Sequence, residues 1–199
     1  MDVIEAMETC SAARYLKPDP VPQELIERVI YAATRASSPG NSQQWDFIVV
    51  RDPEAKRKIR DLLVPRFKAM AVGLPTTGRA PSKMIAGAMH LAETLNDVPA
   101  IIFVCGPVAY PPNAPMEQFV WSALYPAAQN LIVAARSLGL GTTFTTFQMF
   151  MENELRELLG IPQEIKFGVM IPIGWPQKDF VKVKRKPITG VIHWDKWSD

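Results

Sequence analysis

One long apolar repeat in the second half of the chain most constrains the fold. From Phe119 to Ala135, in a segment that starts near Met116, apolar residues recur at every third or fourth position, which is the pattern of a helix over about five turns. The repeating residues are Phe119, Val120, Ala123, Leu124, Ala127, Ala128, Leu131, Ile132 and Ala135. The stripe is rich in alanine, so another helix can approach closely, and Gly139 supplies a stop. We therefore expect this helix at the centre of the domain or at a dimer interface.

Shorter apolar segments on both sides of this repeat alternate between helical and strand patterns. Four further helices are expected, over Met1 to about Ala13, Pro22 to Ala33, Asp52 to about Val64, and Met84 to Leu95. A fifth, short helix is expected to end at Gly160. Strands are expected at Asp46–Val50, Ala100–Cys105, Thr142–Phe147 and Phe167–Ile173. Because helices and buried strands are interleaved, we expect one domain over residues 1–199 with a sheet sandwiched between helices.

Composition and charge argue against several classes of protein. With 199 residues, 48% hydrophobic and 21% charged, the chain has the make-up of a globular domain. Its net charge of +2 gives no reason to expect nucleic acid, whose binding needs a clustered basic face. The acidic start M-D-V-I-E-A lacks the apolar core of a signal peptide, and no apolar run approaches the roughly 20 residues of a membrane span. Cys10 and Cys105 fit no disulfide or zinc spacing, so we expect a soluble protein of the reducing cytoplasm.

Standard catalytic devices are missing from the sequence. It has no G-x-S-x-G, no H-E-x-x-H, no Walker loop and no G-x-G-x-x-G that opens a helix. His90 lies on an expected helix and His193 in an aromatic tail, so packing or surface roles are favoured for both. We assign no catalytic side chain and no metal site. An enzyme with this sequence would need a cofactor to carry the reaction.

Two irregular regions are candidates for binding. The stretch A-S-S-P-G-N-S-Q-Q-W, from Ala36 to Trp45, forms a loop between an expected helix and an expected strand. Composition alone favours an ordinary polar loop, but loops at strand ends often bind ligands, and amides and hydroxyls suit a polar heterocycle. Residues 65–83 lack periodicity and are expected to form a lid, a binding loop or a mobile segment.

Basic side chains near both ends of the chain are candidates for holding an anion. If V-K-V-K-R-K forms a strand, Lys182, Lys184 and Lys186 share one face and Arg185 takes the other. Either Arg185 or the lysines could grip a phosphate, and a solvated lysine-rich edge strand is an equal alternative. Arg14, where the first helix gives way to a proline-rich turn, is a second candidate.

These pieces together resemble the FMN-dependent nitroreductase superfamily along nearly the whole chain. The first motifs that carry the resemblance are A-A-R-Y-L-K-P-D-P-V-P and A-S-S-P-G-N-S-Q-Q-W-D-F-I-V-V. The later ones are S-A-L-Y-P-A-A-Q-N-L-I-V-A-A-R-S-L-G-L-G-T-T-F-T-T, E-L-R-E-L-L-G-I-P, I-P-I-G-W-P and K-R-K-P-I-T-G-V-I-H-W-D-K-W. Each motif is moderately specific, whereas their order and spacing together are highly specific.

The resemblance implies an α+β fold with a central mixed, mainly antiparallel sheet flanked by helices, in an intertwined homodimer with FMN at the subunit interface. It also implies a C-terminal extension over residues 181–199. By the same resemblance, Arg14 faces the flavin pyrimidine or ribityl chain, and Arg185, supported by Lys184 or Lys186, holds the phosphate. The other residues carried over are Ser38, Asn41 and Gln43 at polar flavin atoms, Thr145 and Thr146 near flavin N5, and Ser122, Tyr125 and Gln129 along the pocket.

The chain departs from the family pattern in its first motif. Many relatives have Arg-Arg-Ser where this chain has Cys10, Ser11 and Ala12, and use an Arg and the Ser on the FMN phosphate. A charge-assisted hydrogen bond of that kind is worth about 1.5–3 kcal/mol. We therefore expect weaker FMN binding, by roughly tenfold to more than a hundredfold. Ser37 and Gln44 stand where many relatives have proline, which alters the rigidity of the loop more than its chemistry.

The favoured hypothesis is an NAD(P)H:acceptor oxidoreductase. NADH or NADPH would reduce FMN by hydride transfer and leave, and a nitroaromatic, a quinone or another conjugated small-molecule acceptor would take its place in a ping-pong cycle. A degenerate relative that binds a ligand without redox chemistry, or serves as a dimeric interaction protein, is the alternative. A third reading within the family is a reaction on flavin itself or on a halogenated aromatic.

Overall fold

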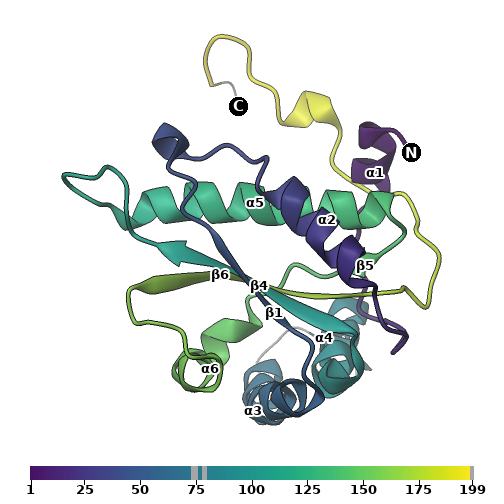
Figure 1. Ribbon diagram of the computed structural model, residues 1–199. Helices are drawn as coiled ribbons and strands as arrows, with labels where there is room; N and C mark the ends of the chain where they lie inside the picture. Colours follow the sequence, from purple (N-terminus) through teal and green to yellow (C-terminus); the bar gives the residue numbers. More distant parts are fainter. Residues whose placement is uncertain (73–75, 78–79, 198–199) are drawn as a thin grey trace.

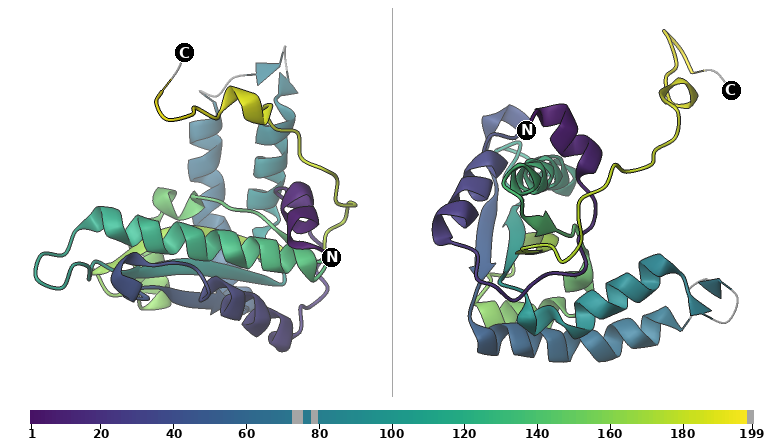
Figure 2. Two further views of the ribbon diagram at one scale, coloured as in Figure 1. Left: turned by 90° about the horizontal axis from the view of Figure 1, so that it is seen from above. Right: turned by 90° about the vertical axis from the view of Figure 1, so that its right-hand side faces the viewer.

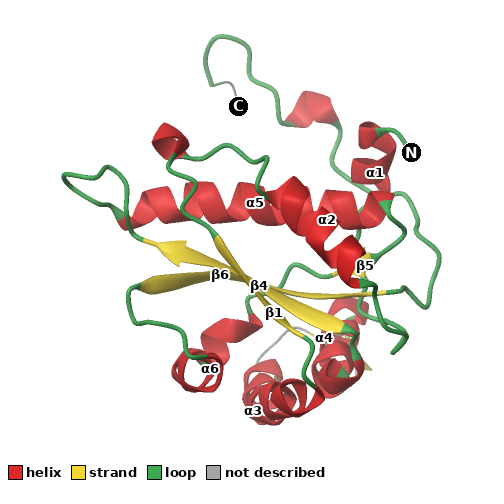
Figure 3. Cartoon of the chain, viewed as in Figure 1, coloured by secondary structure: helices red, strands yellow, loops and turns green. Residues whose placement is uncertain are grey.

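The computed structural model describes residues 1–72, 76–77 and 80–197. Helices and strands alternate along the chain much as the sequence predicts (Figures 1 and 3). The helices are α1 (Val3–Thr9), α2 (Gln23–Ala33), α3 (Pro53–Ala71), α4 (Lys83–Glu93), α5 (Glu117–Ser137) and α6 (Glu152–Leu159), with short 3-10 turns η1 (Pro39–Asn41), η2 (Leu95–Asp97), η3 (Phe147–Phe150) and η4 (Ile188–Gly190). The strands are β1 (Asp46–Val50), β2 (Thr76–Thr77), β3 (Ala80–Pro81), β4 (Ala100–Pro107), β5 (Gly141–Thr142) and β6 (Ile165–Gly174).

The central sheet has the order β1-β4-β6-β5, and each neighbouring pair is antiparallel. One isolated parallel bridge joins Ala12 to Thr142 beside β5. Helices α2 and α5 cover one face of the sheet, while α3, α4 and α6 cover the other (Figure 1). This is the α+β architecture that the resemblance implies, with the sheet between two layers of helices.

The central strand β4 feeds both layers of the core. Because side chains alternate along a strand, Ile101 and Phe103 join the cluster that contains α3, α4 and α6. Ile102 and Val104 join the opposite cluster, which contains α2 and α5. All four side chains are completely buried. The continuous apolar run predicted to be covered on both faces is therefore confirmed.

Two helix boundaries differ from the prediction. The first helix ends at Thr9 rather than near Ala13, because Ala13 N–H donates to the carbonyl of Thr142 at 2.9 Å and draws this segment into extended pairing. Helix α3 continues past Pro65 to Ala71, although an internal proline costs about 3 kcal/mol. Buried Phe67 continues the i, i+4 stripe of the preceding turns, and this burial offsets the missing hydrogen bond.

The expected loop over 65–83 is consequently much shorter than predicted. The structure places 65–71 in α3, pairs β2 with β3, and begins α4 at Lys83. Residues 73–75 and 78–79 of the predicted loop lie outside the described residues. Helices α3 and α4, joined through β2 and β3, form an arm that projects from the body (Figure 2).

The threonine-rich strand expected over Thr142–Phe147 is mostly absent, because β5 ends at Thr142 and Phe147 begins a 3-10 turn. Thr143 and Thr145 still donate their N–H groups to carbonyls of β6, at Pro172 and Met170. Pro172 has no N–H to return toward Thr143, so the ladder is interrupted at this point.

The segment V-K-V-K-R-K does not form a strand. It belongs to a C-terminal tail, residues 181–197, that extends away from the body on the same side as the arm (Figure 2). Among the described residues, its last main-chain hydrogen bond to the body runs from Val183 N to Glu8 O at 2.8 Å. Residues 198–199 of the predicted C-terminal extension lie outside the described part of the chain.

Candidate functional site

The inner side of the arm and the segment after β5 enclose a pocket of about 290 Å³. Its polar groups come from Arg14 and from three threonines, Thr143, Thr145 and Thr146. Its apolar wall comes from α3, α4 and η3, through Phe67, Met70, Met84, Ala88, Leu91, Phe147 and Phe150, with Phe144 beside the threonines. A mostly apolar cavity with a few convergent polar groups is the usual form of a small-molecule site. The volume lies at the lower end of the usual range, about 300–1,000 Å³.

Arg14 is the positive group of this pocket. Its side chain crosses α4 at Gly87, where a Cβ would lie only 3.1 Å from Arg14 Cδ, so glycine allows this close approach. No carboxylate among the described residues forms an ion pair with Arg14. A half-buried guanidinium that lacks an internal counterion is well placed to bind an electron-rich or anionic ligand.

The three threonines differ in their hydrogen bonds and in their exposure. Thr143 Oγ1 donates to Ala13 O at 2.9 Å and ties the Arg14 segment to the loop after β5. Thr145 is buried, and its Oγ1 donates to Met170 O at 2.8 Å, so its hydroxyl proton is committed to the fold. Thr146 is exposed at the pocket. Of the two threonines predicted to lie near flavin N5, Thr146 is therefore the one with the freer side chain.

A row of aromatic rings links the pocket to the open face of α5. Tyr125 lies between Trp121 and Phe144, with ring centroids 5.9 Å from each, and Phe144 lines the pocket. Ser122 lies on the same exposed face, where its hydroxyl donates to Phe119 O at 2.9 Å. The two predicted substrate residues thus lie on one face of α5, with Tyr125 next to the pocket rim.

The predicted binding loop at Ser38, Asn41 and Gln43 has an unusual backbone. Gly40, Asn41 and Gln43 all have positive φ values, of 57°, 51° and 49°. Ser38 Oγ accepts a hydrogen bond from Gln43 N at 3.0 Å and closes the loop on itself. Backbone strain of this kind concentrates at binding sites when the surroundings hold it in place.

Tyr110 provides part of that support. A Cβ added at Gly40 would lie 2.3 Å from Tyr110 Cε2, so the ring is packed directly on this glycine. The ring also meets Phe119 edge to face, with centroids 5.4 Å apart. These contacts anchor the loop to the first turn of α5.

The predicted cofactor ligands do not meet within one chain. Arg14, Thr145 and Thr146 line the pocket, whereas Ser38, Asn41 and Gln43 are not among its lining residues. Figure 1 shows η1, in dark blue, near the opposite end of α5 from α1. Lys184 and Arg185 lie on the tail; both are exposed, and Arg185 Nη1 donates to Lys184 O at 3.1 Å. A single subunit therefore presents parts of the predicted site on separate surfaces.

Comparison with known proteins identifies the family to which this chain belongs. The model of the Nitroreductase family matches residues 9–175, which covers most of the chain and includes Arg14, the 36–45 loop and the threonine segment. The chain belongs to the nitroreductase family.

Relatives within and around the family have different activities. A "Putative NADH dehydrogenase/NAD(P)H nitroreductase" of Archaeoglobus fulgidus is 29% identical over 201 residues, which cover 98% of this chain and 99% of the relative. Iodotyrosine deiodinase 1 of Mus musculus is 27% identical over 193 residues, which cover 94% of this chain and 67% of that protein. A crystal structure of oxidized iodotyrosine deiodinase bound to FMN and 3-iodo-L-tyrosine superposes with a TM-score of 0.81 at 20% identity, over 98% of this chain and all of that one.

For a nitroreductase-family chain, the arm supplies pocket residues that the sequence interpretation missed. Phe67 and Met70 were assigned to an irregular loop, yet they lie on α3 and line the pocket. The available signal was the spacing of Ile59, Leu63 and Phe67, which continues one helical stripe through Pro65.

Neither cysteine of this nitroreductase-family chain is suited to nucleophilic catalysis. Burial raises the pKa of the Cys105 thiol to about 12, with the nearby Asp46 adding to the effect. Burial also raises the pKa of Cys10, against a smaller opposing effect of Arg136. Both thiols therefore stay protonated near neutral pH.

Among the described residues there is no cluster of His, Cys, Asp or Glu able to hold a metal ion. The same residues include no helix with the length and apolar character to cross a bilayer.

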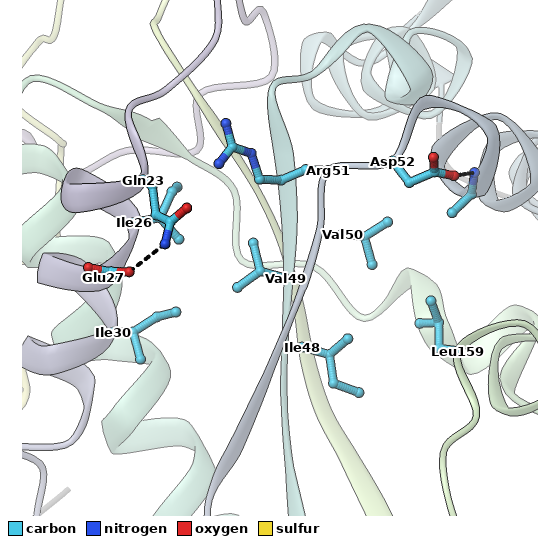
Figure 4. A pocket seen from close by; sticks show the side chains of 11 residues that line it. Gln23, Ile26, Glu27, Ile30, Ile48, Val49, Val50, Arg51, Asp52 and Leu159 are labelled. Carbon is cyan, nitrogen blue, oxygen red and sulfur yellow. Dashed lines mark hydrogen bonds between the residues drawn. The ribbon is translucent and has the colours of Figure 1, made fainter.

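A hollow larger than this pocket lies elsewhere, along the outer side of β1 (Figure 4). It measures about 540 Å³, and Ile26, Ile30, Ile48, Val49 and Leu159 give it a mainly apolar lining. Its polar margin includes Gln23, whose Nε2 donates to Glu27 Oε1 at 2.7 Å. Strand β1 is the edge of the sheet, so its outer backbone groups face this hollow without a paired strand among the described residues. A wide apolar groove at a strand edge suits a polypeptide better than a small polar cofactor.

Proposed function

We propose that this chain is an FMN-dependent oxidoreductase that accepts reducing equivalents from NADH or NADPH and passes them to a nitroaromatic, a quinone or a similar conjugated acceptor. The observation that carries the proposal is the pocket in which unpaired Arg14 and exposed Thr146 face an apolar, aromatic wall. The bound FMN would supply the redox chemistry, and the two substrates would use it in turn.

The residues of the pocket fit the polar edge of a flavin. Arg14 would lie against the pyrimidine ring, where its positive charge stabilises the negative charge that reduction places there. Thr146 would offer a hydroxyl or a main-chain group to the central part of the ring. The aromatic and methionine side chains of the arm would cover the remaining surface and keep water away from it.

A second copy of the chain would complete the site. Ser38, Asn41 and Gln43 are exposed or half-buried and lie apart from Arg14 in one subunit, so we assign them to a flavin held mainly by the partner subunit. The exposed face of α5, with Ser122, Tyr125 and Gln129, would then lie in the interface. This arrangement also explains why the pocket of a single chain is small for a flavin.

The tail and the hollow beside β1 fit the same dimer. The tail exposes large apolar side chains at Ile188, Val191, Trp194 and Trp197, and it extends away from its own body. The hollow offers an apolar surface and an unpaired strand edge. We propose that the tail of one copy lies in the hollow of the other, so that the two subunits are intertwined.

The acceptor is the part of the proposal with two candidates. The aromatic lining of the pocket favours a planar conjugated molecule, which agrees with a nitroaromatic or a quinone. A halogenated aromatic is the second candidate, and the similarity to iodotyrosine deiodinase over 94% of this chain favours it. Turnover assays would separate the two candidates by comparing nitrophenols and quinones with halogenated phenols of similar size.

The deciding experiment is a visible absorption spectrum of the purified protein with added FMN, followed by NADPH or NADH under anaerobic conditions. We expect a flavin spectrum that stays with the protein through gel filtration and bleaches on addition of a nicotinamide. If saturating FMN does not bind, the flavoenzyme proposal is wrong. If FMN binds and neither nicotinamide bleaches it, the NAD(P)H-dependent reaction is wrong and a non-redox ligand-binding role is favoured.

A further inference from the structure

A second, smaller recess lies beside the pocket, between the segment that follows α1 and the segment that follows β6. The two segments are joined at one end, where Gln177 N donates to Tyr15 O at 2.9 Å. They are joined again where Val183 N donates to Glu8 O at 2.8 Å. Between these points no main-chain hydrogen bond links them in the described chain, and they separate around a recess of about 180 Å³.

The lining of this recess is positively charged. Arg14 and Lys178 contribute two cations, Asp179 contributes one carboxylate, and Ser11 contributes a hydroxyl group. Lys178 Nζ lies 3.9 Å from the centroid of the Tyr15 ring, a cation–π contact that holds the ammonium group in place and leaves its N–H donors available. No carboxylate among the described residues is within ion-pair distance of Lys178.

Arg14 lies at the border between the recess and the pocket. Of the residues that the structure describes, it alone lines both cavities. A ligand with its ring system in the 290 Å³ pocket could therefore pass Arg14 and place a small anionic group in the 180 Å³ recess. A phosphate monoester matches the size of the recess, carries close to two negative charges at neutral pH, and accepts several hydrogen bonds.

We propose that this recess binds the 5′-phosphate of FMN, with Lys178 as the main cation and Ser11 as a hydrogen-bond donor. This assignment rests on the proposed flavin-binding function. It gives the chain a cation near Cys10–Ala12, where the arginine and serine common in relatives are absent. The basic residues of the tail are less suitable within one subunit. Lys182 is paired with Glu8 at 2.6 Å, and Arg185 is exposed beyond the last main-chain contact with the body.

The test compares FMN with riboflavin, which has the same ring and ribityl chain but no phosphate. Dissociation constants for both are measured by quenching of flavin fluorescence on the full-length protein. Replacing Lys178 by methionine should weaken FMN binding roughly tenfold to a hundredfold, because one charge-assisted contact is lost. Riboflavin affinity should change by less than about twofold. Lys178→Arg keeps the charge and should restore most of the preference for FMN.

Lys182→Met is the matched control, since it removes the same charge from the same segment at a residue already paired with Glu8. It should leave the ratio of the two dissociation constants unchanged. The proposal is overturned if Lys178→Met weakens FMN and riboflavin equally, or leaves FMN binding unchanged. If the unaltered protein binds neither flavin, the flavoenzyme function itself fails, and this outcome is distinct from a failure of the phosphate site alone.

Discussion

Strand β4 and the C-terminal tail are both rich in large apolar side chains, yet the two regions have opposite surroundings. In β4, Ile101, Ile102, Phe103 and Val104 are completely buried between two layers of helices. In the tail, Trp194 and Trp197 are 81% and 79% exposed. A tryptophan side chain that becomes buried removes about 150–250 Å² from water, which is worth several kcal/mol at roughly 25 cal/mol per Å². One chain therefore completes its core but leaves large apolar side chains of the tail exposed, and this is the surface that the proposed dimer would cover.

The largest expected effect is in the core. Phe103→Ala removes a fully buried ring that meets Phe167 edge to face, with centroids 5.8 Å apart. We expect the free energy of unfolding to fall by about 3–5 kcal/mol in urea denaturation, because the cavity is enclosed on both sides. Val72→Ala is the control, since Val72 is almost fully exposed, and it should change stability by less than about 0.5 kcal/mol. Equal effects of the two substitutions would contradict the contrast between buried and exposed apolar residues.

Substitutions in the tail should weaken the proposed dimer without changing the fold of the single chain. Replacing Trp194 and Trp197 together by alanine should raise the dimer dissociation constant by at least about a hundredfold, because two apolar anchors are lost. Analytical ultracentrifugation over a concentration series measures this change, and far-UV circular dichroism should stay the same. Lys196→Ala is the neighbouring control. A tail variant that dimerises as tightly as the unaltered protein would rule out the proposed docking in the hollow beside β1.

The predicted binding loop around Gly40 lies between these two extremes, because it is largely exposed and yet one of its glycines packs directly against the Tyr110 ring. Gly40→Ala adds a Cβ at φ 57° and 2.3 Å from Tyr110 Cε2, so we expect a loss of about 1–3 kcal/mol in unfolding free energy. In the Tyr110→Ala background the collision is gone and only the cost of the positive φ remains. The same Gly40 substitution should therefore cost less there, which a double-mutant cycle in urea measures. Additive effects would show that Tyr110 does not restrain the loop.

The smallest effect concerns a buried charge at the edge of the core. Burial lowers the pKa of Lys56, and its Nζ donates to Val98 O at 2.5 Å. A lysine pKa that is lower in the folded state than in the unfolded state means that the unfolded chain binds more protons between the two values. Stability should therefore rise as the pH increases through the folded pKa toward the ordinary lysine value. The raised pKa values of the two cysteines lower stability over the same pH range, so the Lys56 contribution is measured as a difference between variants. In urea denaturation at pH 7 and pH 10, the unfolding free energy of the unaltered protein should gain relative to Lys56→Met as the pH rises, whereas its difference from exposed Lys58→Met should stay constant.

Periodicity predicted those elements whose environment is uniform along their length. The α5 stripe from Val120 to Ala135 is buried apart from the half-buried Ile132, and the β4 run is completely or nearly completely buried, so the pattern of apolar residues and the local structure agree. The prediction was wrong where a distant partner changed the outcome. The first helix ends early because Ala13 N–H donates to the carbonyl of Thr142. The strand expected over Thr142–Phe147 ends early because Pro172 has no N–H to pair with it.

The candidate site shows the same division. The motifs named Arg14, Thr146 and the Ser38–Gln43 loop by resemblance, and the structure placed Arg14 and Thr146 in one pocket. The roles of these residues toward flavin stay predictions. Lys178 carried no motif, because its relation to Arg14 depends on two segments that lie about 160 residues apart in the chain and side by side in the fold.

The sequence by itself determined the α+β class, the buried strand β4, the central helix and membership of the nitroreductase family. These follow from local periodicity and from motifs whose order is written along the chain. Only the tertiary structure decided that α3 and α4 project together as an arm, that Thr145 commits its hydroxyl to β6, and that Arg14 lines two cavities. Each of these depends on contacts between residues far apart in sequence, and such contacts can outweigh a local preference of about 1–3 kcal/mol.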